Sequence, residues 1–165
     1  MKKSIVIYNS RGGNTKKVAT QIAEGLGAEL VKSNKIPDLQ EYNFVVVGTW
    51  VMAGMPSPGG KKYLGKLEAE KLKGKKVTMF ISAAGPEDPP LGQEPEAGII
   101  KDLVFEQIEK ILTEKGIEVT KERLATMGAF RFMRFGPGSS KKGYPTEEIL
   151  QEAKKFGESL KKYLK

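Results

Sequence analysis

The stretch that decides the fold lies near the start of the chain and reads Ile5-Val6-Ile7-Tyr8-Asn9-Ser10-Arg11-Gly12-Gly13-Asn14-Thr15. A short apolar run ends in a turn rich in glycine and polar side chains, and a helical pattern begins directly afterwards. Such a turn gathers backbone N–H groups, hydroxyls and the positive end of a helix dipole. The stretch therefore predicts a strand, a phosphate-binding turn and a helix. An ordinary strand-to-helix turn is the alternative, because Gly, Asn and Ser are common turn residues.

Two other phosphate-binding motifs fit this turn less well. A Walker loop requires the run Gly-x-x-x-x-Gly-Lys-Ser/Thr, which the chain does not contain. A dinucleotide-binding fingerprint requires a third glycine after Gly12-Gly13 and an acidic residue near the end of the second strand. The second predicted strand runs instead into Ser33-Asn34.

The length of 165 residues predicts a single domain over residues 1–165, large enough to bury a core. No apolar run has the length that crosses a bilayer, and the apolar stretch after Lys2-Lys3 is too short for a signal peptide. We therefore expect a cytoplasmic protein without membrane insertion.

Cysteine and histidine are both absent from the chain. Their absence excludes disulfides, thiol nucleophiles, iron–sulfur clusters and imidazole acid–base chemistry, and it removes the usual zinc ligands. A redox function would therefore require a bound organic cofactor.

The formal net charge is +8, which favours partners with an acidic contact surface. Nucleic acid is the other common partner of a basic protein. The lysines, however, are spread along predicted helix faces and mixed with glutamate, and no RNA-binding motif of interleaved aromatic and basic residues occurs. We therefore expect solvated helix faces and no nucleic-acid partner.

Strand and helix patterns alternate along the whole chain. Strands are expected at residues 5–8, 29–32, 44–48, 75–82 and 124–130, with residues 117–120 as a candidate lead-in to the last one. Helices are expected directly after the first turn, at residues 59–72, at residues 99–116 and from Thr146 onwards. Five strands alternating with helices predict an α/β fold with a doubly wound parallel sheet.

The run Ser10–Thr15 resembles the phosphate loop of flavodoxins, in which Ser/Thr-x-Thr-Gly-x-Thr follows the first strand. Gly12 stands where that family usually has Thr, so one hydroxyl donor is missing. The phrase Leu72-Lys73-Gly74-Lys75-Lys76-Val77 is also similar to the lead-in to the fourth flavodoxin strand. The resemblance extends over nearly the whole chain. It implies a flavodoxin-like three-layer α/β/α sandwich with a five-stranded parallel sheet of order 2-1-3-4-5, for which flavodoxin itself is the standard example.

The resemblance also implies a binding site for FMN, at the point where the strand order reverses. The phosphate would be held by Ser10, Arg11, Gly12, Gly13, Asn14 and Thr15, and the ring by Thr49, Trp50, Val51, Met52, Ala53, Gly54, Ser82, Ala83, Ala84 and Gly85. Trp50 or Met52 can supply the flat apolar wall that a flavin ring needs. Alternatively, Trp50, the only tryptophan, packs on the next helix.

Two loops carry further expectations. A flavin N5 gains a proton on one-electron reduction, and the small residues Ala53-Gly54 would allow a peptide to turn its carbonyl towards N5 at low cost. The loop 82–85 lacks the Tyr or Trp that many flavodoxins stack on the outer flavin face. The aromatic and basic segment 130–138 either covers the flavin or attracts an anionic partner, or it continues the last strand with one exposed face.

These observations lead to three functional hypotheses. The first is an FMN-binding electron carrier that serves a redox partner protein, in which no residue acts as acid or base. The second is an FMN-dependent reductase that passes electrons from NAD(P)H to a quinone or similar acceptor, supported by the basic residues Arg131 and Arg134. The third is a flavin-free module that binds a protein partner, supported by the glycine at position 12.

Overall fold

A parallel sheet forms the middle layer of the computed structural model, which describes residues 2–128 and 143–165. Its strands are β1 (Ser4–Tyr8), β2 (Glu29–Lys32), β3 (Phe44–Met52), β5 (Lys76–Ala83) and β6 (Glu118–Met127). They lie in the order β2-β1-β3-β5-β6, and each neighbouring pair is parallel. The two-residue strand β4 (Met55–Pro56) pairs antiparallel with the end of β3. Leaving β4 aside, this is the predicted order 2-1-3-4-5.

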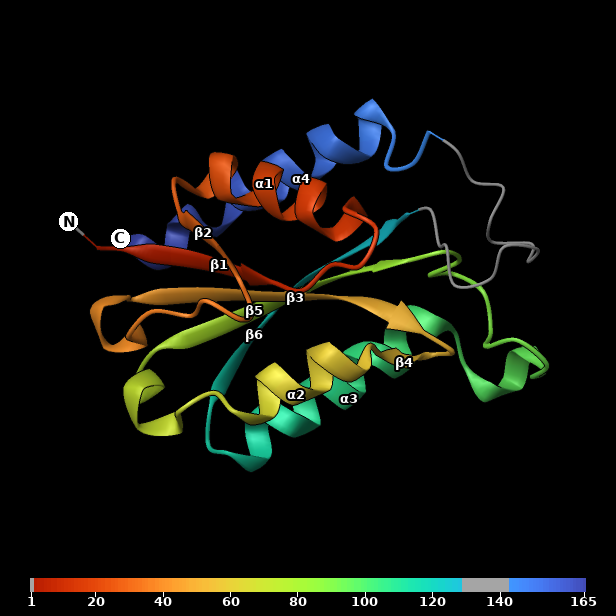
Figure 1. Ribbon diagram of the computed structural model, residues 1–165, viewed down its shortest axis with the longest axis horizontal. Helices are drawn as coiled ribbons and strands as arrows, with labels where there is room; N and C mark the ends of the chain where they lie inside the picture. The colour runs from red at the N-terminus through yellow and green to blue at the C-terminus, as the bar shows by residue number, and fades with distance from the viewer. Residues whose placement is uncertain (1, 129–142) are drawn as a thin grey trace.

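Helices cover both faces of the sheet, as Figure 1 shows. Helices α1 (Asn14–Leu26) and α4 (Glu147–Ser159) pack on one face, and α2 (Pro58–Gly65) and α3 (Ile100–Glu114) pack on the other. The predicted three-layer α/β/α sandwich is therefore confirmed.

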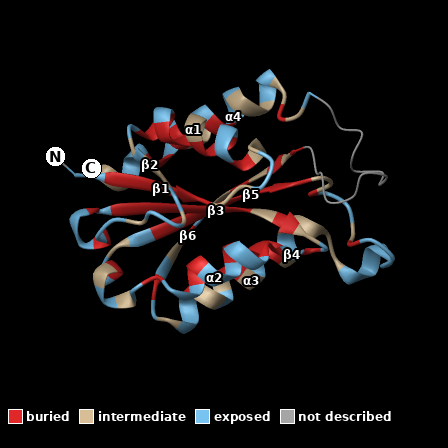
Figure 2. Ribbon diagram, in the orientation of Figure 1, coloured by how far each residue is buried: buried red, intermediate tan, exposed pale blue. Residues whose placement is uncertain are grey.

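The sheet separates two apolar layers because successive strand residues point to opposite faces. In β3, Val45 and Val47 belong to the layer under α2 and α3, whereas Val46 belongs to the layer under α1 and α4. All five residues of β1 are buried, as expected for a central strand covered on both faces. Figure 2 shows this burial along the central strands.

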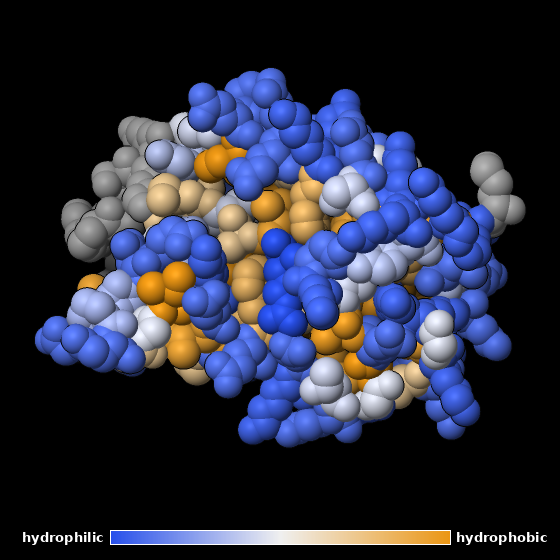
Figure 3. Space-filling view, turned by 180° about the vertical axis from the view of Figure 1, so that it is seen from behind, coloured by the Kyte–Doolittle hydropathy of each residue, from blue (hydrophilic) through white to orange (hydrophobic). Residues whose placement is uncertain are grey.

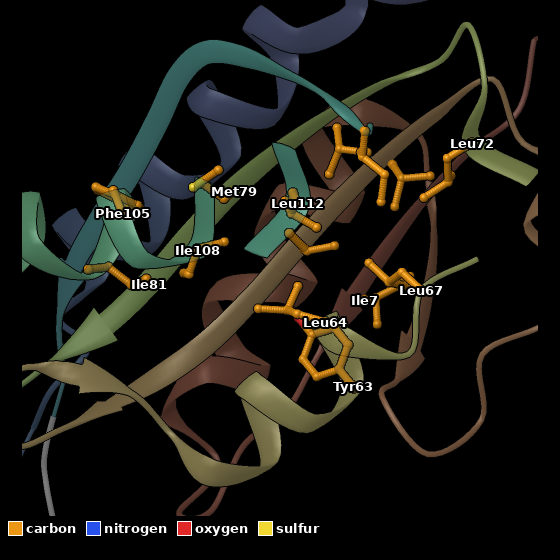
Figure 4. Close-up of a cluster of buried hydrophobic side chains, with 14 of the residues drawn as sticks. Ile7, Tyr63, Leu64, Leu67, Leu72, Met79, Ile81, Phe105, Ile108 and Leu112 are labelled. Atoms are coloured by element: carbon orange, nitrogen blue, oxygen red, sulfur yellow. The ribbon is translucent and has the colours of Figure 1, made fainter. Parts of the chain in front are cut away.

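Side chains from the sheet, from α2 and from α3 together form the apolar layer on that side of the sheet. Figure 4 shows Met79 and Ile81 from β5 directed towards Ile108 and Leu112 from α3, with Leu64 of α2 nearby. Burial of such side chains contributes roughly 1.5–3 kcal/mol each. The outer surface differs: on the face shown in Figure 3, hydrophilic residues surround scattered apolar patches.

Three elements differ from the sequence-based expectation. The helix expected over residues 59–72 ends at Gly65, and a separate 3-10 turn follows at Ala69–Leu72, since glycine is a weak helix former. Strand β3 continues beyond the expected residue 48 to Met52, because its pairing with β5 extends to Trp50 and β4 pairs with Val51 and Met52. Residues 49–52, which follow the expected strand 44–48, therefore lie in the same strand.

The last strand begins earlier than its expected start at residue 124. Strand β6 runs without interruption from Glu118, so the candidate lead-in at residues 117–120 belongs largely to the same strand. The pairing shifts between Val77↔Val119 and Met79↔Arg123, which leaves two extra residues on β6. This bulge obscures the alternating pattern in the sequence. Residues 129 and 130 of the expected strand lie outside the described residues.

No helix within residues 2–128 and 143–165 is long and apolar enough to span a bilayer.

Helices α1 and α4 approach each other closely through two glycines. A Cβ atom on Gly25 would lie 2.0 Å from the carbonyl oxygen of Lys154, and one on Gly157 would lie 2.2 Å from that of Ile22. Both obstacles are backbone atoms, so only a shift of a whole helix would make room for a methyl group. The α1–α4 layer therefore depends on the absence of these two side chains.

We predict that Gly25→Ala and Gly157→Ala each lower the free energy of unfolding by about 1–3 kcal/mol, as expected for an overpacked contact. Urea unfolding measured by circular dichroism would give these values.

The matched control is Gly65→Ala in α2, where a Cβ atom would meet nothing within 4 Å. That change should be neutral or stabilise the protein by up to about 1 kcal/mol, because alanine favours the helix. Equal effects of the three substitutions would contradict this account of α1–α4 packing.

Candidate site at the carboxyl ends of the central strands

A crevice site is set up where the strand order reverses between β1 and β3. These strands pair from Ser4↔Phe44 to Tyr8↔Gly48, and the N–H of Asn9 donates to the carbonyl of Gly48 at 3.2 Å. After β1 the chain turns to α1 on one face of the sheet, and after β3 it continues to α2 on the other (Figure 1). In doubly wound folds, ligands bind in a crevice at the point where connections diverge in this way, so the carboxyl ends of β1 and β3 form the candidate site.

The predicted phosphate loop forms the entrance to α1. Gly13 is the N-cap of that helix at φ 90°, in the left-handed region that favours glycine, and its N–H donates to the hydroxyl oxygen of Ser10 at 3.0 Å. Arg11 and Gly12 are exposed and Thr15 is buried. A Cβ atom on Gly12 would meet nothing within 4 Å, so space is not the reason for the missing threonine.

The start of α1 has the electrostatic character of an anion site. Its first turn contains no acidic residue, and no side chain caps it among the described residues. Lys16 and Lys17 follow instead, although positive charges are unfavourable beside the positive end of a helix dipole. By contrast, α3 and α4 both carry acidic residues in their first turns. A bound anion would relieve this unfavourable arrangement in α1.

Side chains at the end of β3 divide between the two faces of the sheet. Val51 belongs to the apolar layer under α2 and α3, and Thr49 lies on that same face by alternation. Trp50 and Met52, each partly exposed, lie on the opposite face, with α1. Of these four predicted ring contacts, Trp50 and Met52 therefore have side chains on the face of the phosphate loop.

Strand β5 ends beside the start of α1. A Cβ atom on Gly128 would lie 2.5 Å from the hydroxyl oxygen of Ser82 and 3.4 Å from Cβ of Asn14. The structure thus brings together one residue from each of the two predicted segments, 10–15 and 82–85. Ala83 belongs instead to the apolar layer on the α3 side, and Ala84 and Gly85 follow it in a partly exposed turn.

The predicted turn Ala53-Gly54 connects β3 to β4 as a two-residue hairpin loop, since Met52 pairs with Met55. Both residues have positive φ, 51° for Ala53 and 73° for Gly54. The carbonyl of Gly54 accepts a hydrogen bond of 3.1 Å from the side chain of Gln107 in α3. The peptide between Ala53 and Gly54, which was expected to turn its carbonyl towards a flavin N5, lies at this tip, and that movement stays a prediction.

A polar cluster at the same edge was not predicted from the sequence. The hydroxyl of Ser57, the N-cap of α2, lies 2.9 Å from both Nδ2 of Asn9 and Oγ1 of Thr49, and it accepts from the N–H of Gly60. The Oδ1 atom of Asn9 is buried without a partner among the described residues. The run Ser57-Pro58-Gly59-Gly60 was the available signal, since Ser followed by Pro is typical of a helix start.

Two buried tyrosines lie near the ends of β1 and β3, and the pKa of each is raised. Burial raises the pKa of Tyr8 above its usual value. It raises that of Tyr63 further, and the Tyr63 hydroxyl donates to the carbonyl of Gly48 at 2.7 Å. The described residues include no group of three or more acidic side chains that could hold a metal ion. The basic residues Arg131 and Arg134 lie outside the described residues.

Comparisons with known proteins agree with this architecture. The flavodoxin domain family matches residues 5–125. An uncharacterized protein of Methanocaldococcus jannaschii, MJ0298, is 26% identical over 167 residues, covering 97% of this chain and 99% of that protein.

Among solved structures, a flavodoxin from the domain Archaea has a TM-score of 0.66 at 19% identity, covering 97% of this chain and 96% of the other. Oxidised Flavodoxin 2 from Bacillus cereus has a TM-score of 0.63 at 22% identity, covering 94% of each chain. These similarities concern the fold. The match over residues 5–125 covers most of the chain, so this protein belongs to the flavodoxin domain family.

Proposed function

We propose that this protein binds FMN in the crevice between β1 and β3 and functions in electron transfer. The observation that carries the proposal is the start of α1, where a left-handed glycine cap and a first turn without acidic residues favour a bound anion. FMN would supply the redox chemistry that a chain without cysteine or histidine lacks.

Each part of the crevice suits one part of that cofactor. The loop from Ser10 to Thr15 would hold the phosphate through backbone N–H groups and hydroxyls. Trp50 and Met52, on the same face of the sheet as α1, would form the wall against the ring. The turn Ser82–Gly85 would approach the ring through its backbone, which its small side chains permit.

The partner would be a redox protein with an acidic contact surface, because the chain carries a net charge of +8. The second candidate is an FMN-dependent reductase that takes electrons from NAD(P)H for a quinone or similar acceptor. Its sequence support, Arg131 and Arg134, lies outside the described residues. We favour the carrier, since the described residues supply no second nucleotide-binding motif.

We predict that the protein binds FMN more tightly than riboflavin, which lacks the phosphate. Thr15→Val should weaken FMN binding by roughly 1.5–3 kcal/mol, the usual size of a hydrogen bond to a charged group, and should leave riboflavin binding nearly unchanged. Fluorescence titrations with both ligands measure this difference.

Thr20→Val is the matched control, since the Thr20 hydroxyl bonds the carbonyl of Lys16 within α1. It should not change the preference for FMN. Gly12→Thr adds the missing hydroxyl, and the open space at Gly12 accepts its side chain. This substitution should therefore tighten FMN binding. If Thr15→Val weakened the binding of FMN and of riboflavin equally, the assignment of the phosphate to this loop would be contradicted.

A further prediction separates the carrier from the reductase. The FMN-loaded carrier should be bleached by photoreduction, but NADPH or NADH alone should reduce it negligibly under anaerobic conditions. Stopped-flow absorbance of the flavin band records both reactions. Rapid bleaching by NADPH alone would establish the reductase instead, and Arg131→Ala and Arg134→Ala would then be expected to raise the NADPH concentration required.

A further inference from the structure

The loop after β5 presents a leucine to solvent on a well-defined turn. Leu91 is 96% exposed. It occupies the second position of a turn in which the N–H of Gln93 donates to the carbonyl of Pro90 at 3.0 Å, and Gly92 follows it at φ 79°. Glycine at positive φ in the third position is typical of a type II turn. Single exposed apolar residues are common on protein surfaces, but here the backbone fixes the direction in which the side chain is presented.

The charge of this loop is opposite to that of the whole chain. Residues 86–98 contain four acidic residues and no basic one, whereas the net charge of the chain is +8. Glu87 is 2.6 Å from the ammonium group of Lys101. Glu94 and Glu96 are exposed and form no ion pair with any described residue. Leu91 is therefore followed along the loop by two carboxylates that are available to a partner.

A pocket with the complementary character lies on the side of the sheet that carries α2. It has a volume of about 290 Å³ and is bounded by residues 33–39 on one side and residues 63–71 on the other. A water molecule occupies about 30 Å³ in the liquid, so the pocket has room for a whole leucine side chain. Much of its lining is apolar and consists of Ile36, Pro37, Leu39, Tyr63 and Leu67.

Two lysines line the same pocket, and their surroundings differ. Lys71 lies 3.3 Å from a carboxylate oxygen of Asp38 and 3.2 Å from one of Glu68, so its charge is already balanced within the molecule. Lys66 is exposed and forms no ion pair with any described residue. Lys66 is therefore the pocket lysine that can pair with a carboxylate from outside.

We propose that the protein associates with a second copy of itself, with Leu91 of one copy in the pocket of the other and with Glu94 and Glu96 near Lys66. The loop and the pocket match in size, in apolar character and in charge. In Figure 1 the loop after β5 lies at the right and the connection from β2 to β3 lies at the left, so one molecule cannot fill its own pocket. The contact is head-to-tail, which means that it either closes into a ring or adds further copies.

Sedimentation equilibrium of the natural protein tests the association, at concentrations up to about 1 mM because a small contact binds weakly. Species larger than the monomer are expected, and added salt should reduce them by screening the exposed charges. Leu91→Ser and Lys66→Glu should each weaken the association by at least about tenfold. Lys155→Glu, the same charge change on α4, should retain it. A natural protein that stays monomeric would overturn the proposal and leave the loop and the pocket to other partners.

A mixture of the two variants tests the pairing itself. Leu91→Ser keeps the pocket and Lys66→Glu keeps the loop, so the mixture should form a one-to-one dimer that does not grow further. With Leu91→Ser isotope-labelled, NMR signals of Ile36 and Leu67 should shift on mixing. With Lys66→Glu labelled instead, the signal of Gln93 should shift. A mixture that stays monomeric, or in which only other signals shift, would overturn the proposal. Neither measurement requires bound FMN.

Discussion

Parallel pairing between β1 and β3 is the constraint on which the rest of this structure depends. It places the end of β1 beside Gly48, with the N–H of Asn9 bonded to the Gly48 carbonyl. Because the chain then leaves the two strands towards opposite faces, the starts of α1 and α2 meet the same edge of the sheet. A Cβ atom on Gly48 would lie 2.0 Å from the ring of Phe80, so the contact with β5 depends on this glycine too. The crevice follows from backbone pairing, and side chains then decide what it can hold.

Much of the fold could be predicted because its signals are local. The apolar run 5–8, the run 44–48 and the alternation of strands and helices each depend on residues close together in the sequence. Two of the errors arose where pairing with another strand decides the outcome. Strand β3 continues to Met52 because β5 pairs with it as far as Trp50 and β4 pairs with its last two residues, and β6 includes a bulge that hides its alternation. The helix expected over 59–72 was extended through Gly65, although glycine favours an end there.

The candidate site also combines features that have a local sequence signal with contacts between residues far apart in the sequence. The turn around Gly13 could be predicted, because a run of Ser, Gly and Asn between an apolar run and a helical pattern is a local signal. The hydrogen bond from Gln107 to Gly54 joins residues 53 positions apart, and no short pattern announces it. The same holds for Asn9, Ser57 and Thr49, which meet only after the sheet has formed. Sequence similarity suggested which loops lie at the crevice, whereas strand alternation in the structure decides which of their side chains face it.

The most direct test of the central claim is a titration of the natural protein with FMN, monitored by the emission of Trp50. No other residue contributes tryptophan fluorescence, since the chain contains one tryptophan. Trp50 lies at the end of β3 on the face of the sheet that carries the phosphate loop. Strong, saturable quenching by FMN, reversed when the flavin is removed, is the result that this account predicts. Unchanged emission at saturating FMN, or no saturation at all, would contradict a flavin site between β1 and β3.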